Sequence, residues 1–210
     1  MPRVCRSMLY VPGNNPSMLQ HCPVFGADSV LLDLEDAVAI TEKDAARHLV
    51  AHFLRSLDFG EMVVTVRLNG ADTEYFEEDI RAIVPCRPDA VRLPKCHTAE
   101  DVRRLDGLIG AVEREQRLPE GGVKIHAMIE TARGVEHSYE IACASPRVDA
   151  LTLGGQDLTA DMGVRKTPGG SEIFYARSRV VMAARAAGID VFDTVWVDVN
   201  DNEGLLEETR

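Results

Sequence analysis

The stretches Ile125-His-Ala-Met-Ile-Glu130 and Ala150-Leu-Thr-Leu-Gly-Gly-Gln-Asp157 decide the fold class. Each is a short apolar run that stops at a charged or turn residue, and a helical pattern follows. Five further runs do the same, at residues 8–13, 30–35, 62–69, 90–95 and 195–198. Apolar runs of about four to eight residues that alternate with helical stretches indicate βα units on a parallel sheet. The chain therefore belongs to the α/β class.

The number of these units favours a closed barrel over an open sheet. An open dinucleotide-binding sheet would carry G-x-G-x-x-G after its first strand, and Val11-Pro-Gly-Asn-Asn15 differs from that pattern. A TIM-type (β/α)8 barrel has eight strands and about 250 residues, whereas this chain has 210 residues and seven runs. We expect a single (β/α) barrel domain over residues 1–210, C-terminally incomplete and without its eighth strand.

Composition excludes several function classes. The chain has 23 basic and 34 acidic residues, which give a net charge of −11. It therefore lacks the overall positive potential that attracts nucleic acids and anionic membranes. No apolar stretch approaches the roughly 20 residues of a membrane span, and the N-terminus lacks the apolar core of a secretory signal. Five cysteines without C-x-x-C spacing indicate reduced thiols. A cytoplasmic protein is expected.

Two carboxylates follow neighbouring strands and suggest a metal site. Glu130 and Asp157 end successive apolar runs, and adjacent parallel strands lie about 4.8 Å apart. A site with two protein carboxylates, completed by water or substrate, suits Mg²⁺ better than Ca²⁺. Alternatively, each carboxylate caps its following helix or pairs with an arginine.

A second group of charged residues follows the second and third runs. Arg67, in Val-Arg-Leu-Asn, can grip a substrate carboxylate through two parallel hydrogen bonds, or it can form a structural ion pair with Asp33, Glu35 or Asp36. Alternation along a strand places Asp33 and Glu35 on one side, where buried acids need a cation. We expect these acids to support the site from behind rather than to react.

Lys95 and two glycines complete the candidate site. A lysine at this end of a barrel raises a Schiff-base aldolase as a rival mechanism, and a salt-bridged lysine is the simpler alternative. Gly154 and Gly155 allow the backbone to approach a ligand closely. The six histidines have no metal-ligand spacing and are expected at the surface.

Taken in order, the motifs resemble the citrate lyase β-subunit family, which comprises citryl-acyl-carrier-protein lyases with malyl-CoA and citramalyl-CoA lyase relatives. The matching stretches cover nearly the whole chain: Arg6-Ser-Met-Leu-Tyr-Val-Pro-Gly-Asn-Asn15, Ala27-Asp-Ser-Val-Leu-Leu-Asp-Leu-Glu-Asp-Ala-Val38, Val66-Arg-Leu-Asn69, Val91-Arg-Leu-Pro-Lys95, Met128-Ile-Glu-Thr131, Leu153-Gly-Gly-Gln-Asp157, Ala183-Ala-Arg-Ala-Ala-Gly-Ile189 and Asp193-Thr-Val195. One departure is Gln156, where the family usually has an acid.

The resemblance implies a Mg²⁺-dependent carbon–carbon lyase that cleaves a 3-hydroxyacyl thioester by retro-Claisen chemistry, with citryl thioester giving oxaloacetate and acetyl thioester. It implies Glu130 and Asp157 as metal ligands and Arg67 as the clamp on oxaloacetate or a similar keto acid. Acyl carrier protein or CoA would carry the thioester. A trimer-like homo-oligomer or a citrate lyase complex would be the assembly.

Family members continue past the end of this chain with an eighth strand and a C-terminal lid. Three alternatives to the citryl lyase therefore stay open. They are a malyl-CoA or citramalyl-CoA lyase, a Schiff-base aldolase that uses Lys95, and a non-catalytic subunit.

Overall fold

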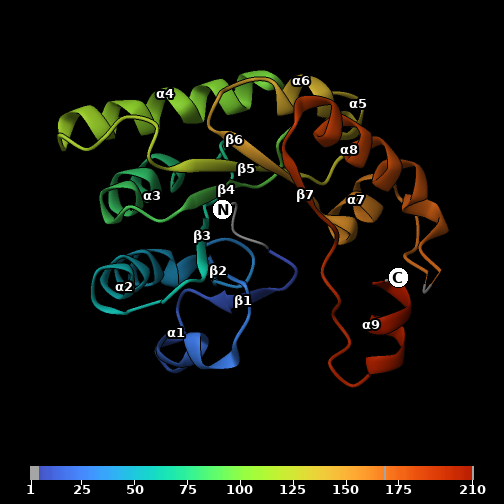
Figure 1. Ribbon diagram of the computed structural model, residues 1–210, viewed down its shortest axis with the longest axis horizontal. Helices are drawn as coiled ribbons and strands as arrows, with labels where there is room; N and C mark the ends of the chain where they lie inside the picture. Colours follow the sequence, from blue (N-terminus) through green and yellow to red (C-terminus); the bar gives the residue numbers. More distant parts are fainter. Residues whose placement is uncertain (1–4, 168, 210) are drawn as a thin grey trace.

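Seven parallel strands form one sheet whose order in space is their order in the chain (Figure 1). The computed structural model describes residues 5–167 and 169–209. The strands are β1 (Met8–Pro12), β2 (Ser29–Asp33), β3 (Val63–Arg67), β4 (Ala90–Leu93), β5 (Lys124–Ile129), β6 (Val148–Leu153) and β7 (Asp190–Phe192). The sequential parallel order confirms the predicted barrel-type α/β fold. In the described part of the chain β1 and β7 are the edges of the sheet, and no eighth strand joins them.

Helices follow the strands and form an arc outside them (Figure 1). The α-helices are α1 (Pro16–His21), α2 (Lys43–Ser56), α3 (Phe76–Ile83), α4 (Ala99–Glu115), α5 (Ala132–Glu136), α6 (Ser138–Ala142), α7 (Gly155–Asp161), α8 (Phe174–Ala187) and α9 (Asn202–Glu208). Short 3-10 turns lie at η1 (Cys22–Phe25), η2 (Ile40–Glu42), η3 (Val84–Cys86) and η4 (Ser171–Ile173). Within the described ranges no helix is both long and apolar enough to cross a membrane.

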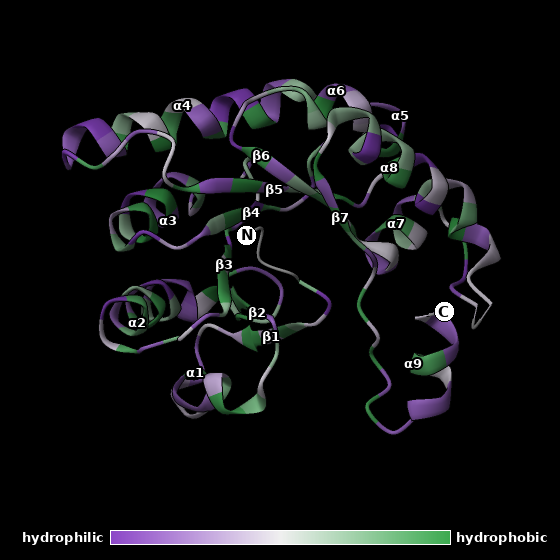
Figure 2. Ribbon diagram, viewed as in Figure 1, coloured by the Kyte–Doolittle hydropathy of each residue, from purple (hydrophilic) through white to green (hydrophobic). Residues whose placement is uncertain are grey.

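The two faces of the sheet bury different residues. On β4, Val91 and Leu93 belong to the large apolar core beneath the helices, so Arg92 between them faces the barrel interior. The same alternation puts Thr65 and His126 on the interior face. In Figure 2 hydrophobic and hydrophilic residues follow each other along the outer helices, as expected of helices with one face against a sheet. Apolar burial against the helices holds the sheet, which leaves the interior free to be polar.

The seventh strand was predicted at residues 195–198, and this is wrong. The strand that pairs with β6 is Asp190–Phe192, with Ala150 opposite Asp190 and Thr152 opposite Phe192. It starts soon after Gly188, whose left-handed backbone (φ 75°) ends α8. The apolar run at residues 195–198 has the composition of a strand, but it pairs with no strand in the described part of the chain. Val197 in that run is 58% exposed.

Candidate functional site

A pocket of about 520 Å³ opens at the carboxyl ends of the strands. This is the end at which (β/α) barrels carry their active sites. Its lining includes Tyr10 from β1, Asp33 from β2, Arg67 from β3, and Gly154 and Asp157 from the chain after β6. The predicted site residues that line this cavity are Asp33, Asp36, Arg67, Gly154, Gly155 and Asp157. Glu35, Lys95 and Glu130 are not among its lining residues.

Asp33 and Arg67 are joined by a two-pronged ion pair. They are register partners at the ends of β2 and β3, and Arg67 Nε and Nη2 donate to the Asp33 carboxylate at 2.7 and 2.6 Å. The same carboxylate accepts the backbone N–H groups of Glu35 and Ala37. Burial lowers the pKa of Arg67, but the ion pairs outweigh burial and raise it. The guanidinium is therefore permanently charged and fixed in orientation.

The other edge of the Arg67 guanidinium faces more acids. Its Nη1 lies 3.1 Å from Glu35 Oε2 and 3.7 Å from Asp36 Oδ2. Glu35 also pairs with Lys95, whose Nζ lies 3.0 Å from Oε1. Burial raises the pKa of Glu35, partly offset by Arg67. The expectation that the buried acids contact a cation is confirmed. Arg67 forms the structural ion pairs that the sequence suggested as the alternative to a substrate clamp.

Lys95 contributes to the site through its backbone as well as its side chain. It has a left-handed backbone (φ 48°), uncommon for a residue with a side chain, and its N–H donates to Glu130 Oε1 at 2.6 Å. The hydrogen bond with Glu35 raises the pKa of the Lys95 ammonium. A Schiff base requires the neutral amine, so this environment disfavours Lys95 as a nucleophile.

Glu130 presents a buried carboxylate oxygen without a partner. The residue follows β5 and is 1% exposed, and its Oε2 accepts no hydrogen bond from the described residues. Burial raises the pKa of Glu130 to about 8, with Glu35 and Asp157 adding to the effect and the Lys95 N–H opposing it. A buried carboxylate oxygen of this kind needs a proton or a cation.

Asp157 lies in the first turn of α7 rather than at a strand end, because β6 stops at Leu153. It is partly exposed, lines the pocket and repels Glu130 electrostatically. No group of three or more His, Cys, Asp or Glu side chains suited to a metal occurs among residues 5–167 and 169–209. Magnesium needs only one or two protein carboxylates, with waters completing its shell. Glu130 and Asp157 therefore fit a hydrated Mg²⁺ ion.

The two glycines make close contacts with protein groups. A Cβ at Gly154 would lie 2.6 Å from both Cβ and Oε2 of Glu130, and a Cβ at Gly155 would lie 2.8 Å from Thr194 Oγ1. The Gly154 N–H donates to the Ile129 carbonyl, and the Gly155 N–H donates to Thr194. Gly154 thus leaves the space that the Glu130 carboxylate occupies.

Two buried polar residues of the barrel interior were not predicted from the sequence, Arg92 and His126. Arg92 is fully buried and donates to the Tyr10 hydroxyl at 2.7 Å. His126 is 4% exposed, so the expectation that all histidines lie at the surface is wrong. The signal that could have revealed them is a charged or imidazole side chain in the middle of an apolar run, at the inward position of the alternation.

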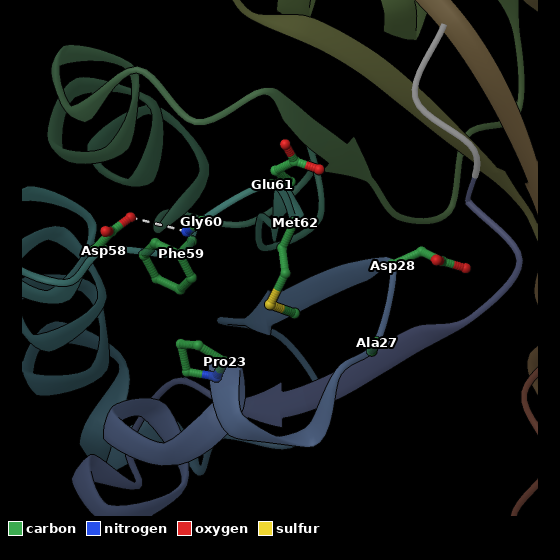
Figure 3. Close-up of a pocket in the computed structure, with 8 residues that line it drawn as sticks. All are labelled: Pro23, Ala27, Asp28, Asp58, Phe59, Gly60, Glu61 and Met62. Atoms are coloured by element: carbon green, nitrogen blue, oxygen red, sulfur yellow. Dashed lines mark hydrogen bonds between the residues drawn. The ribbon is translucent and has the colours of Figure 1, made fainter.

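A second cavity, of about 540 Å³, lies where β2 and β3 begin (Figure 3). Pro23, Phe59 and Met62 supply its apolar surface, and Asp28 points away from them (Figure 3). Asp28 is bound by Arg6, and Asp58 accepts the Gly60 N–H. This is the stability end of a barrel, so the candidate site is the pocket at the opposite end.

Comparison with known proteins shows relatives along nearly the whole chain. The citrate lyase subunit beta of Leuconostoc mesenteroides subsp. cremoris is 46% identical over 208 residues, which are 99% of this chain and 69% of the relative. The L-malyl-CoA/beta-methylmalyl-CoA lyase of Cereibacter sphaeroides is 34% identical over 225 aligned positions, covering 98% of this chain and 70% of the relative.

Solved structures agree with the sequence relatives. The citrate lyase beta subunit of M. tuberculosis, complexed with oxaloacetate and magnesium, superposes with a TM-score of 0.77 at 31% identity, covering 96% of this chain and 83% of that one. The HpcH/HpaI aldolase/citrate lyase family pattern matches residues 6–210. This chain, with its parallel barrel-type sheet and its acidic site at the strand ends, belongs to the HpcH/HpaI aldolase/citrate lyase family.

Proposed function

We propose that the protein is a Mg²⁺-dependent carbon–carbon lyase that cleaves a citryl thioester into oxaloacetate and an acetyl thioester. The family supports a lyase, and citrate lyase β subunits at 39–46% identity support this substrate. The single observation that carries the proposal is the buried Oε2 of Glu130, which has no hydrogen-bond partner among the described residues and whose carboxylate is repelled by Asp157 of the pocket lining. Arg67 lines the same pocket.

Glu130 and Asp157 would hold the metal. When bound, Mg²⁺ would polarise the hydroxyl and carboxylate oxygens of the substrate and stabilise negative charge there. The Lys95 N–H fixes Oε1 of Glu130, and Oε2 is free of hydrogen bonds from the residues that the structure describes. Gly154 keeps the space beside that free oxygen clear.

Arg67 would bind the carboxylate that becomes part of oxaloacetate. Nε and Nη2 donate hydrogen bonds to the Asp33 carboxylate, and these two bonds fix the plane of the guanidinium before the substrate binds. Nη1 faces Glu35 and Asp36 at longer distances, and these weaker contacts can be exchanged for a substrate carboxylate. When the substrate carboxylate replaces Glu35 at Nη1, the ammonium of Lys95 still neutralises the charge of Glu35. Such preorganisation lowers the reorganisation needed as charge develops during C–C cleavage.

The reaction itself is a retro-Claisen cleavage. The substrate hydroxyl loses its proton and becomes the keto group of oxaloacetate. The broken C–C bond leaves its electron pair on the thioester fragment as an enolate, which takes up a proton. The malyl-CoA lyase at 34% identity favours a malyl-CoA or citramalyl-CoA thioester as second candidate. For the carrier we propose acyl carrier protein or CoA, and for the assembly a trimer-like homo-oligomer or a citrate lyase complex.

The test compares citryl, malyl and citramalyl thioesters with metal-depleted protein, before and after Mg²⁺ is added. We expect keto acid release from the citryl thioester only with Mg²⁺, and loss of that release in Glu130→Gln and Asp157→Asn. Glu120→Gln, which removes an exposed carboxylate paired with Arg114, is the control and should retain full activity. Full turnover after exhaustive chelation would contradict the proposal.

A further inference from the structure

Arg92 is a buried cation without a carboxylate partner. It is 0% exposed, and in the described part of the chain no carboxylate oxygen lies within 4 Å of its guanidinium. The groups to which it donates hydrogen bonds are neutral: Nη1 donates to the Tyr10 hydroxyl at 2.7 Å and Nη2 to Met8 Sδ at 3.2 Å. Among the charged groups around it, Glu130 attracts the guanidinium from beyond ion-pair distance and Arg67 repels it. The rings of Tyr10 and Phe192 lie 5.8 and 5.7 Å away. Its Nε has no partner among these residues.

This position is costly for the fold. A charge taken out of water is destabilising unless an opposite charge and hydrogen bonds compensate it. Contacts with aromatic faces and a thioether return only part of that cost. Arg67 is the register neighbour of Arg92 on β3 and repels it. Arg67 has its own carboxylates, whereas Arg92 has none within ion-pair distance among residues 5–167 and 169–209.

Tyr10 connects this buried charge to the substrate pocket. The residue lines the pocket, and its hydroxyl accepts a hydrogen bond from Arg92. Arginine has no acceptor atom, so the Tyr10 O–H cannot donate a hydrogen bond to Arg92 in return. No described residue accepts that proton either. A hydroxyl polarised by a cation is a stronger donor, and its free proton suits an anion in the pocket.

We propose that Arg92 and Tyr10 form a second carboxylate subsite, which selects keto acids with two carboxylates. The inference rests on the proposed function. Oxaloacetate has two carboxylates, and Arg67 with the metal accounts for one of them. The second would accept the Tyr10 O–H and supply the negative charge that Arg92 lacks. Tyr10 is then a substrate-binding residue, and Arg92 is a positioning residue that acts through it.

The test measures binding of malate and lactate in the presence of Mg²⁺ by calorimetry. Both are stable 2-hydroxy acids, and they differ only in the second carboxylate. The wild-type protein should bind malate at least about 10-fold more tightly than lactate, as expected for a charge-assisted hydrogen bond. In Arg92→Met that preference should fall roughly 10- to 100-fold, with lactate affinity unchanged. Tyr10→Phe should reduce the preference about 10-fold.

A thermal measurement separates this subsite from a purely structural role. If Arg92 only held the fold together, Arg92→Met would lower Tm. A cation kept for ligand binding predicts a Tm that is unchanged or higher by roughly 2–4 °C, because an apolar side chain of similar length removes a desolvation cost. Tyr175→Phe is the control, since Tyr175 is exposed and its hydroxyl lies 3.5 Å from Glu136. It should leave both affinities unchanged.

Several outcomes would overturn the inference. One is a wild-type protein that binds lactate as tightly as malate, which would leave the Mg²⁺-dependent lyase standing. Another is retention of the malate preference in Arg92→Met, or in Tyr10→Phe if Arg92→Met fails to fold. Wild-type protein that binds neither acid with Mg²⁺ would overturn the proposed function together with this subsite.

Discussion

A single methyl group at Gly154 tests how tightly the candidate metal site is built. The added Cβ would lie 2.6 Å from Cβ and Oε2 of Glu130 and 2.9 Å from Met128 Cε. Ordinary carbon contacts begin near 3.4 Å, so the Glu130 side chain or the chain after β6 must move by roughly 0.8 Å. Met128 blocks part of the available space, so the carboxylate is the group that we expect to move.

The expected cost has two parts. Overpacking of a tight site costs about 1–3 kcal/mol of stability. A displacement of about 1 Å at a catalytic group costs on the order of 100-fold in rate. We therefore expect Gly154→Ala to bind Mg²⁺ at least about 10-fold more weakly and to lose about 100-fold in kcat/KM. The loss of activity should far exceed what the modest loss of folded protein explains.

The assay combines Mg²⁺ calorimetry, citryl-thioester cleavage and a thermal melt. Gly107→Ala is the matched control, because Gly107 lies inside α4 and a Cβ there meets nothing within 4 Å. That substitution should raise stability by roughly 0.5–1 kcal/mol through helix propensity and leave metal affinity unchanged. Wild-type Mg²⁺ affinity and activity in Gly154→Ala would refute the reasoning that this glycine makes room for the Glu130 carboxylate.

Three further predictions concern the charged residues of the site. The pKa of Glu130 is raised to about 8 by burial, so its stabilising contribution is complete below the unfolded pKa and is lost as pH rises. Metal-free protein should thus lose Tm between about pH 4.5 and 8, and an equally steep fall in Glu130→Gln would contradict this. Treatment with borohydride and a keto acid should leave the mass of the Lys95 peptide unchanged, because Glu35 keeps the amine protonated. A covalent adduct on Lys95 would instead support the Schiff-base aldolase. Arg67→Lys should lower kcat/KM by about 100-fold, since lysine cannot form the two parallel hydrogen bonds with Asp33. The surface control Arg103→Lys should leave kcat/KM unchanged, and equal losses in both variants would count against the substrate clamp.

The sequence predicted the first six strands because each is an apolar run with one face against helices. It failed at β7, where Asp190-Val-Phe192 carries a charge and is shorter than the apolar run that follows. Strand composition at residues 195–198 is real, but a strand also needs a partner, and the partner is set by tertiary structure. The single-domain organisation over residues 1–210 stays a prediction.

The interior of the barrel was the least predictable part. Periodicity identifies which residues of a strand share a face, but it does not say which interior groups meet across the barrel. Arg92 on β4 reaches Tyr10 on β1, and these residues are far apart in the sequence. Neither has a spacing motif that would pair it with the other. Contacts of this kind depend on how the whole sheet curves, which no local pattern encodes.

The ion pairs of Arg67 are compatible with the substrate clamp that we propose for the same side chain. The sequence left open a substrate clamp or an ion pair with the neighbouring acids, as if these excluded each other. A guanidinium has two edges, however, and the Asp33 fork occupies only the edge formed by Nε and Nη2. The register between β2 and β3 creates that fork by placing the two residues opposite each other. The ion pair therefore fixes the orientation of Arg67, and this orientation is what a carboxylate clamp at Nη1 requires.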